Sequence, residues 1–284
     1  MKPAEGSEPT FQSSKIDVGE ITLNVVDEGA GDAILLLHGF PDASRLWRKQ
    51  IPALVDAGYR AIAPDLRGFG ESDRPEEVHA YDLTLVVQDL CNLLDHLDVE
   101  RAHIVGHDWG AVTSWAFAGW EPERTNRLVA ITVGHPGAFL PPSPAQALRS
   151  WYVMFFQLPA VSEAALSARD WALFRASFGV SPDIDYYIRD LSRPGALTSA
   201  LNWYRANARP DRALRRNPGF ERVSAPAMGI WGSKDWVLTE KQMTDSEKFV
   251  DGPWRYERLE AGHWIPLRHA ETLNGLLTGF FSTP

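Results

Sequence analysis

The sequence has few cysteines, few positive charges and no long apolar run, and each shortage excludes a class of protein. Cys91 is the single cysteine among 284 residues, so the chain can form neither an internal disulfide nor a multi-thiolate metal site. We expect Cys91 to fill space in the core. No apolar run approaches the ~20 residues that a membrane-spanning helix needs.

The N-terminus also lacks the marks of a secretory signal. Residues 1–14 have neither a basic start nor an apolar stretch. We expect them to form a loose lead-in, and we predict a cytoplasmic protein without a membrane partner.

Basic residues are in deficit. The chain has 28 Lys and Arg against 37 Asp and Glu, a formal net charge of −9. Because phosphate backbones bind surfaces rich in Lys and Arg, this balance argues against a nucleic-acid partner. The sequence shows no metal-ligating cluster, no phosphate-binding glycine loop and no flavin fingerprint. We therefore predict that no metal or other cofactor is required, and the sequence leaves a monomer and a homodimer both open.

Short β-rich runs alternate with helical patterns in the first half of the chain. The predicted strands are 21–26, 33–37, 60–63, 102–105 and 128–133, and the predicted helices are 46–57, 83–97 and 109–120. Such alternation implies right-handed crossovers and a largely parallel sheet. We predict an α/β fold in which helices flank this sheet.

The alternation stops after Gly134 and resumes near residue 227. A proline-rich linker, FLPPSP (139–144), precedes a stretch with helical patterns up to residue 209. The later elements are predicted as strands 227–231 and 255–259 and helices 239–250 and 270–281. We therefore predict one α/β core built from residues 1–138 and 211–284, interrupted by an all-helical insertion at 139–210.

The segment Gly106-His107-Asp108-Trp109-Gly110 follows a buried strand and precedes a helix. It has the G-x-nucleophile-x-G form of a nucleophile elbow, in which flanking glycines allow a sharp turn that exposes the central side chain. Here that residue is Asp108. A lone Asp at this place is more often an N-cap, but the two glycines favour a nucleophile. We expect His107 to be a structural hydrogen-bonding residue.

Two further segments also follow predicted strands. His38-Gly39-Phe40-Pro41 could be a plain turn, or its backbone N–H groups could join that of Trp109 in an anion-stabilising hole. His263 follows the last predicted strand, and Asp235 lies 28 residues before it. The order Asp108, Asp235, His263 is the nucleophile–acid–base order of α/β-hydrolases.

Together these segments resemble α/β-hydrolase fold enzymes of the epoxide hydrolase branch. The resemblance covers the chain from about residue 16 and rests on HGFP (38–41), DLRGFGES (65–72), GHDWG (106–110), GSKD (232–235) and GHW (262–264). It implies a helical cap domain, which matches the insertion. It also implies that Asp108 attacks an epoxide carbon to form an ester, which water activated by His263 and Asp235 then hydrolyses. We expect the DLRGFGES turn to be structural.

The resemblance also implies two cap tyrosines that assist ring opening. Epoxide hydrolases of this family carry one in an aromatic segment early in the cap and one in an N-W-Y-R segment. These match Tyr152 in WYVMFFQ (151–157) and Tyr204 in NWYR (202–205). Tyr186 and Tyr187 lie on a predicted polar helix, where we expect their hydroxyls to face water.

A haloalkane dehalogenase with the same Asp nucleophile is the alternative activity, and a non-catalytic ligand-binding homologue is a further one. The discriminating feature is Phe40, where dehalogenases usually carry a polar residue. A large share of the aromatic residues, 12 of 31, falls in residues 139–210, which indicates an apolar pocket lining. We predict a small apolar or aromatic epoxide and water as substrates. The candidate substrate-binding residues are Phe40, Pro41, Trp109, Phe178, Trp236 and Trp264.

Overall fold

The computed structural model describes residues 11–139, 142–208 and 219–282. Its strands form one eight-stranded sheet in the order β1-β2-β4-β3-β5-β6-β7-β8. The strands are β1 (Ser13–Asp17), β2 (Thr22–Gly29), β3 (Ala33–Leu37), β4 (Arg60–Pro64), β5 (Ala102–His107), β6 (Thr125–Ile131), β7 (Ala227–Gly232) and β8 (Trp254–Leu259). β1 with β2 and β2 with β4 pair antiparallel, and every other pair is parallel. The predicted mostly parallel sheet is confirmed.

The loose lead-in was predicted over residues 1–14, but its last two residues are ordered: Ser13 and Ser14 belong to the strand β1. They pair with Val26 and Val25 of β2. Ile16 is the one buried residue of β1, so an edge strand of this kind gives almost no apolar pattern in the sequence. Residues 1–10 of the expected lead-in lie outside the described residues.

Helices follow the strands. Outside the insertion they are α1 (Ile51–Asp56), α2 (Leu83–His96), α3 (Trp109–Trp120), α10 (Glu240–Thr244), α11 (Ile265–Arg268) and α12 (Ala270–Phe281). α2 packs on α3, and α1 packs on α12. The single helix predicted over 46–57 is wrong: a 3₁₀ helix, Ser44–Lys49, precedes α1. Pro52 explains the division, because its ring would clash with the carbonyl four residues earlier in a continuous helix.

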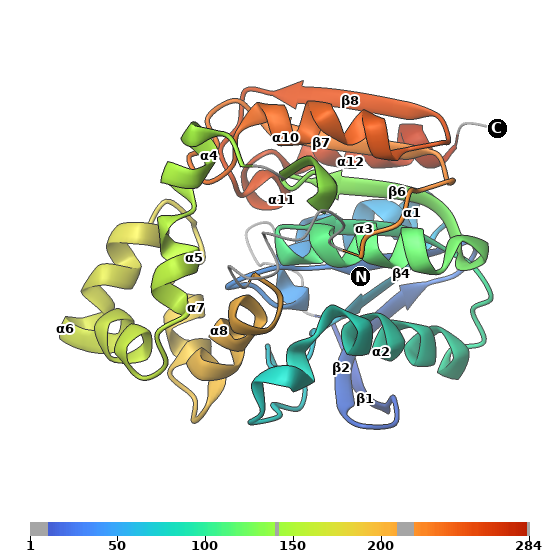
Figure 1. Ribbon diagram of the computed structural model, residues 1–284. Helices are drawn as coiled ribbons and strands as arrows, with labels where there is room; N and C mark the ends of the chain where they lie inside the picture. The colour runs from blue at the N-terminus through green and yellow to red at the C-terminus, as the bar shows by residue number, and fades with distance from the viewer. Residues whose placement is uncertain (1–10, 140–141, 209–218, 283–284) are drawn as a thin grey trace.

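Among the described residues, five α-helices lie between β6 and β7 and gather at one end of the sheet (Figure 1). They are α4 (Pro144–Arg149), α5 (Trp151–Phe156), α6 (Val161–Phe178), α7 (Ile184–Leu191) and α8 (Ala196–Asn207). We propose that they form the cap predicted at 139–210, and we call α4–α8 the cap helices. The boundary predicted between 210 and 211 lies outside the described residues.

The long cap helix α6 is broken in its middle. Ala168 is extended, and Arg169, Asp170 and Trp171 have φ values of 51°, 54° and 59°. Left-handed backbone is unfavourable for non-glycine residues. The surrounding packing must therefore hold this break, and the Trp171 ring is buried edge-to-face against Phe174.

A buried ion pair joins the core to the cap helices. Arg48 donates to both carboxylate oxygens of Asp183, at 2.8 and 2.9 Å, and both side chains are more than nine-tenths buried. Near it, the turn at 65–72 is held by its own charges: Arg67 pairs with Asp89 at 2.6 Å, and Asp65 accepts the N–H of Ser44. The turn thus has the structural contacts expected of it.

The Arg48–Asp183 pair gives a stability prediction. Arg48→Met removes one partner and leaves a buried carboxylate without its counter-charge, which costs about 3–5 kcal/mol of unfolding free energy. Urea unfolding measures this loss, and Arg48→Met with Asp183→Leu is expected to recover most of it. As the control, Arg175→Met breaks the exposed pair with Asp185 and should cost less than about 1 kcal/mol. Equal costs for the two single variants would contradict the prediction.

Candidate active site

Asp108 stands between β5 and α3 on a strained turn. Its φ of 54° and ψ of −121° are rare for a residue with a side chain. The flanking glycines are required sterically: a Cβ on Gly106 would overlap the carbonyl of Gly110, and one on Gly110 would overlap that of Leu37. The local backbone therefore has the form of a nucleophile elbow.

Backbone N–H groups surround the Asp108 carboxylate. The N–H of Phe40, after β3, donates to Oδ1 at 2.8 Å, and the N–H of Trp109 is a further donor to this carboxylate. Gly39 permits the approach, because a Cβ there would overlap Asp108. The two donors predicted to form an anion hole thus both meet at Asp108.

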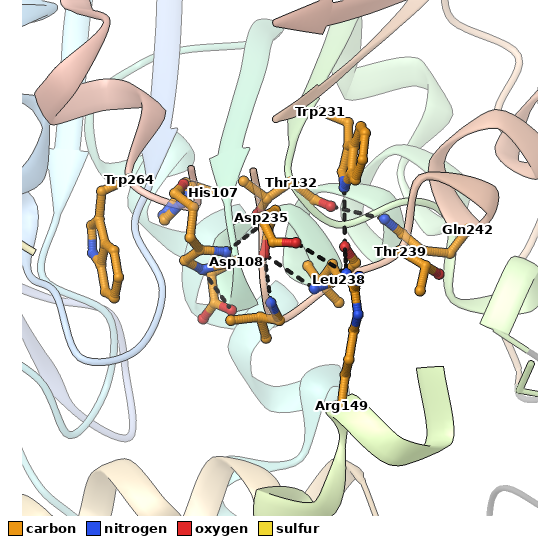
Figure 2. A network of polar contacts seen from close by, with 12 residues as sticks. His107, Asp108, Thr132, Arg149, Trp231, Asp235, Leu238, Thr239, Gln242 and Trp264 are labelled. Atoms are coloured by element: carbon orange, nitrogen blue, oxygen red, sulfur yellow. Dashed lines mark hydrogen bonds and ion pairs between the residues drawn. The ribbon is translucent and has the colours of Figure 1, made fainter. Parts of the chain in front are cut away.

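His263 lies between the two predicted carboxylates. Its Nδ1 is 2.9 Å from Oδ2 of Asp235, and its Nε2 is 3.7 Å from Oδ2 of Asp108. Oδ1 of Asp235 accepts the N–H groups of Val237 and Leu238, at 2.8 and 3.1 Å. Figure 2 shows Asp108 and Asp235 with these contacts as dashed lines. The order predicted from the sequence is therefore also an arrangement in space.

Charge controls the protonation of His263 and Asp108. Burial by itself lowers the pKa of His263, but Asp235 and Asp108 outweigh burial and raise it to about 10. Burial raises the pKa of Asp108, while the hydrogen bond and charge of His263 reverse this and hold it below the usual value. At neutral pH the resting site therefore holds an imidazolium between two carboxylates.

His107, next to the nucleophile, is a different kind of histidine. Its Nε2 lies 3.0 Å from the carbonyl oxygen of His263. Burial, and then the charge of His263, lowers the pKa of His107 to about 4. A neutral ring that donates to this carbonyl matches the structural role expected for it.

Tyr152 of α5 and Tyr204 of α8 pack edge-to-face and line one pocket with Asp108. Their ring centroids are 5.9 Å apart. Burial, and then the negative charge of Asp108, raises the pKa of both phenols. Both remain protonated at neutral pH and can donate.

A single pocket joins these groups. Its lining consists of Phe40, Asp108, Tyr152, Phe178, Tyr204, Trp236, Val237, His263 and Trp264. Four of the six candidate substrate-binding residues belong to this lining. The other two do not: Pro41 follows Phe40 through a cis peptide bond, and the Trp109 ring packs edge-to-face against Tyr204.

Known proteins are similar to this chain in sequence and in fold. Residues 32–270 match the α/β hydrolase fold family. The chain belongs to this family. It is 36% identical to the AB hydrolase superfamily protein YfhM of Bacillus subtilis, over 92% of this chain and 95% of that protein. It is 33% identical to epoxide hydrolase A of Mycobacterium tuberculosis, over 94% of this chain and 96% of that protein.

Solved structures of epoxide hydrolases have the same fold as this chain. The crystal structure of epoxide hydrolase A from Mycobacterium thermoresistibile superposes with a TM-score of 0.83 at 31% identity, over 95% of this chain and 98% of that chain. The crystal structure of an epoxide hydrolase from Bacillus megaterium in complex with an inhibitor superposes with a TM-score of 0.86 at 26% identity. The match covers 95% of this chain and 100% of that chain. The resemblance to the epoxide hydrolase branch and the predicted fold class are thus confirmed.

Within 11–139, 142–208 and 219–282, no group of three or more His, Cys, Asp and Glu side chains is arranged to hold a metal ion. In the same ranges, no helix has the length and apolar character to cross a bilayer.

The cap helix α4 holds the loop that carries Asp235, a contact that the sequence did not indicate. Arg149 donates to the carbonyls of Asp235 and Leu238, at 3.0 and 2.8 Å, and Figure 2 shows it reaching this loop from α4. Gln146 donates to the carbonyl of Val237 and accepts the N–H of Thr239. Ordinary Arg and Gln residues on a short helix carry no signal for such contacts.

A second unpredicted contact centres on Asp42, which is buried. Tyr187 of α7 donates to its Oδ1 at 2.6 Å, and the Trp264 indole donates to its Oδ2 at 3.2 Å. The expectation that Tyr187 faces water is wrong, because its side chain is fully buried. Burial raises the pKa of Asp42 to about 7, although both hydrogen bonds oppose the rise.

Tyr187→Phe should therefore destabilise the protein in a pH-dependent way. The raised pKa means that folded Asp42 keeps its proton between pH 4 and 7 where the unfolded chain does not, so its contribution to stability falls as the pH rises through this window. The hydrogen bond from Tyr187 to Asp42 limits that loss of stability. Its removal is expected to cost about 0.5–1.5 kcal/mol at pH 5.5 and about 1.5–3 kcal/mol at pH 8.5, because a charged acceptor forms the stronger bond.

Urea unfolding at the two pH values measures the difference. The matched control is Tyr186→Phe. Arg45 and Arg189 contact the ring of Tyr186, and this variant keeps the ring. A pH-independent cost for Tyr187→Phe, equal to that of the control, would contradict the account of Asp42.

Proposed function

We propose that this epoxide-hydrolysing enzyme converts an apolar or aromatic epoxide and water to a vicinal diol through an ester on Asp108. One observation carries the proposal: an ionised buried carboxylate, an imidazole and two protonated phenols line the same pocket. The carboxylate is a nucleophile for an sp³ carbon, and the phenols are acids for the oxygen that leaves it.

In the first step, an oxygen of Asp108 attacks an epoxide carbon, and the ring C–O bond breaks. The oxygen that leaves takes a proton from Tyr152 or Tyr204, which gives a hydroxyalkyl ester and a tyrosinate. The raised pKa of both phenols makes the tyrosinate a strong base. It therefore needs a proton before the second step.

His263 can supply that proton. Once Asp108 is an ester it is neutral, so one of the two carboxylates that raise the pKa of His263 no longer acts on it. The imidazolium then loses its proton to the tyrosinate and becomes a neutral base. The chemistry of the first step thus prepares the base for the second.

In the second step, His263 takes a proton from a water molecule whose oxygen attacks the ester carbon of Asp108. Asp235 fixes the imidazole tautomer and stabilises the imidazolium that forms. The N–H groups of Phe40 and Trp109 stabilise the tetrahedral oxyanion. Collapse breaks the ester C–O bond, the departing alkoxide takes the carboxyl proton, and the diol leaves with the carboxylate and the imidazolium restored.

The halide alternative has less support from the same pocket. A departing halide needs N–H donors and no acid. Phe40 has no side-chain donor, and Trp109 does not belong to the pocket lining. A binding-only role does not account for a complete set of nucleophile, base and acids in one pocket.

The ester mechanism predicts where oxygen from water goes. In a single turnover of a styrene oxide-type substrate in ¹⁸O-water, the label is expected in the Asp108 carboxylate, because water attacks the ester carbon. Mass spectrometry of the Asp108 peptide measures this. His263→Gln should accumulate the ester, visible as an added substrate mass on the intact protein, and His263→Gln with Asp108→Ala is the matched control without a nucleophile.

Label found only in the diol after the first turnover would rule out the ester on Asp108. A parallel assay with a bromoalkane separates the two activities. Diol formation without halide release is expected, whereas halide release without diol formation would favour the dehalogenase.

The two phenols give a separate prediction. Tyr152→Phe with Tyr204→Phe should lower the rate of ester formation by about 10²–10⁴-fold, because positioned acids contribute on this scale. Stopped-flow kinetics of the first step measures the change, and each single variant should lose less because the other phenol remains. Tyr186→Phe, outside the pocket lining, is the control. Full epoxide activity in the double variant would show that the acid assignment is wrong.

A further inference from the structure

Arg149 of the cap helix α4 binds the loop that carries Asp235 at two places. One nitrogen, Nη1, donates to the carbonyl oxygens of Asp235 and Leu238, at 3.0 and 2.8 Å, and Figure 2 shows this side chain beside the loop. The indole of Trp231, in β7, donates to the same Leu238 carbonyl at 3.3 Å. The Leu238 carbonyl is thus bound both by the sheet and by the cap helices.

Gln146, one turn before Arg149 on α4, reaches the acid through the backbone. Its Nε2 donates to the carbonyl of Val237 at 3.2 Å. The peptide group that contains this carbonyl also contains the N–H of Leu238, which donates to Oδ1 of Asp235 at 3.1 Å. One rigid, planar peptide group therefore connects Gln146 to the Asp235 carboxylate.

The next peptide group along the loop is held by α4 at both ends. Its carbonyl, that of Leu238, accepts from Arg149, and its N–H, that of Thr239, donates to Oε1 of Gln146 at 2.9 Å. Gln146 is only 3% exposed, and buried polar groups need such partners. These contacts fix the orientation of two successive peptide groups beside the acid.

We propose that Arg149 and Gln146 are positioning residues for ester hydrolysis: they hold the peptide groups that keep the Asp235 carboxylate against His263. This inference rests on the proposed function, in which His263 and Asp235 act in the second step. The contact that they maintain is the 2.9 Å approach of Oδ2 to Nδ1, which fixes the imidazole tautomer and orientation.

The groups that perform the first step are held by other contacts. The N–H of Phe40 binds the Asp108 carboxylate, and the Tyr152 ring packs edge-to-face against Tyr204. Neither contact involves the loop 235–239. Loss of the α4 contacts should therefore slow ester hydrolysis and leave ester formation nearly unchanged.

Arg149→Met removes both donated hydrogen bonds and keeps an unbranched side chain. We expect ester hydrolysis to slow by about 10–10²-fold, because a displacement of about 1 Å at a catalytic group can cost this much. Ester formation is expected to stay within about threefold. Single-turnover stopped-flow kinetics gives both rates, and the intact mass should show the ester accumulating. Gln146→Leu should slow the same step, and it provides the test if Arg149→Met does not fold.

Arg149→Lys is the conservative variant. Both hydrogen bonds come from a single nitrogen, so a lysine ammonium, which acts as a point donor, should keep hydrolysis within about threefold of the unmodified rate. The matched control is Arg175→Met on α6, because Arg175 contacts Asp170 and Asp185 within the cap helices. It should leave both rates within about twofold.

Proton NMR follows the Asp235–His263 contact without any substrate. An imidazolium N–H that donates to a carboxylate gives a signal far downfield, and loss of that signal in His263→Gln assigns it. The unmodified protein and Arg149→Lys should show the signal. Arg149→Met should weaken it or move it upfield.

The outcomes separate this inference from the proposed function. If the unmodified protein hydrolyses no epoxide, the proposed function fails, and the NMR signal alone decides whether Arg149 positions Asp235. If Arg149→Met keeps both the hydrolysis rate and the signal, Arg149 does not position the acid. Equal slowing of both steps, or no recovery in Arg149→Lys, would also overturn the proposal.

Discussion

A buried negative charge, the Asp108 carboxylate, is the constraint on which the rest of the site depends. Burial opposes its ionisation, so the fold must surround it with donors and positive charge. The donors come from the ends of three strands: Phe40 after β3, Trp109 after β5 and His263 after β8. A parallel sheet brings the carboxyl ends of its strands to one edge, and this makes such convergence possible.

The same charge links the two steps of the proposed reaction. While Asp108 is ionised, it helps to raise the pKa of His263, which keeps the imidazole protonated. When Asp108 becomes an ester, that contribution disappears. The base is then formed only after there is an ester for it to hydrolyse, and no separate conformational change is needed.

The cap helices do more than close the pocket. Arg149 of α4 donates to the carbonyl of Asp235, and Tyr187 of α7 donates to the buried Asp42. They also supply Tyr152 and Tyr204 to the pocket lining. Movement of the cap would therefore change both the binding space and the position of catalytic groups.

The sequence by itself determined the features that depend on neighbouring residues. The buried strand 33–37 and the helices 109–120 and 270–281 have the predicted bounds, because their apolar patterns are strong. The elbow at Asp108 was predictable because a sharp turn needs glycine on both sides. Weak local patterns failed: β1 has one buried residue, and Pro52 divided a helix that appeared continuous.

Only the tertiary structure decided the contacts between distant segments. Tyr187 and Asp42 are 145 residues apart, and a tyrosine on an amphipathic helix can face either water or the core. The contacts of Arg149 with the carbonyls of Asp235 and Leu238 depend in the same way on how α4 packs onto the core. Local propensity leaves these choices open, because the free energy that decides them comes from burial and hydrogen bonding after the insertion has packed onto the core.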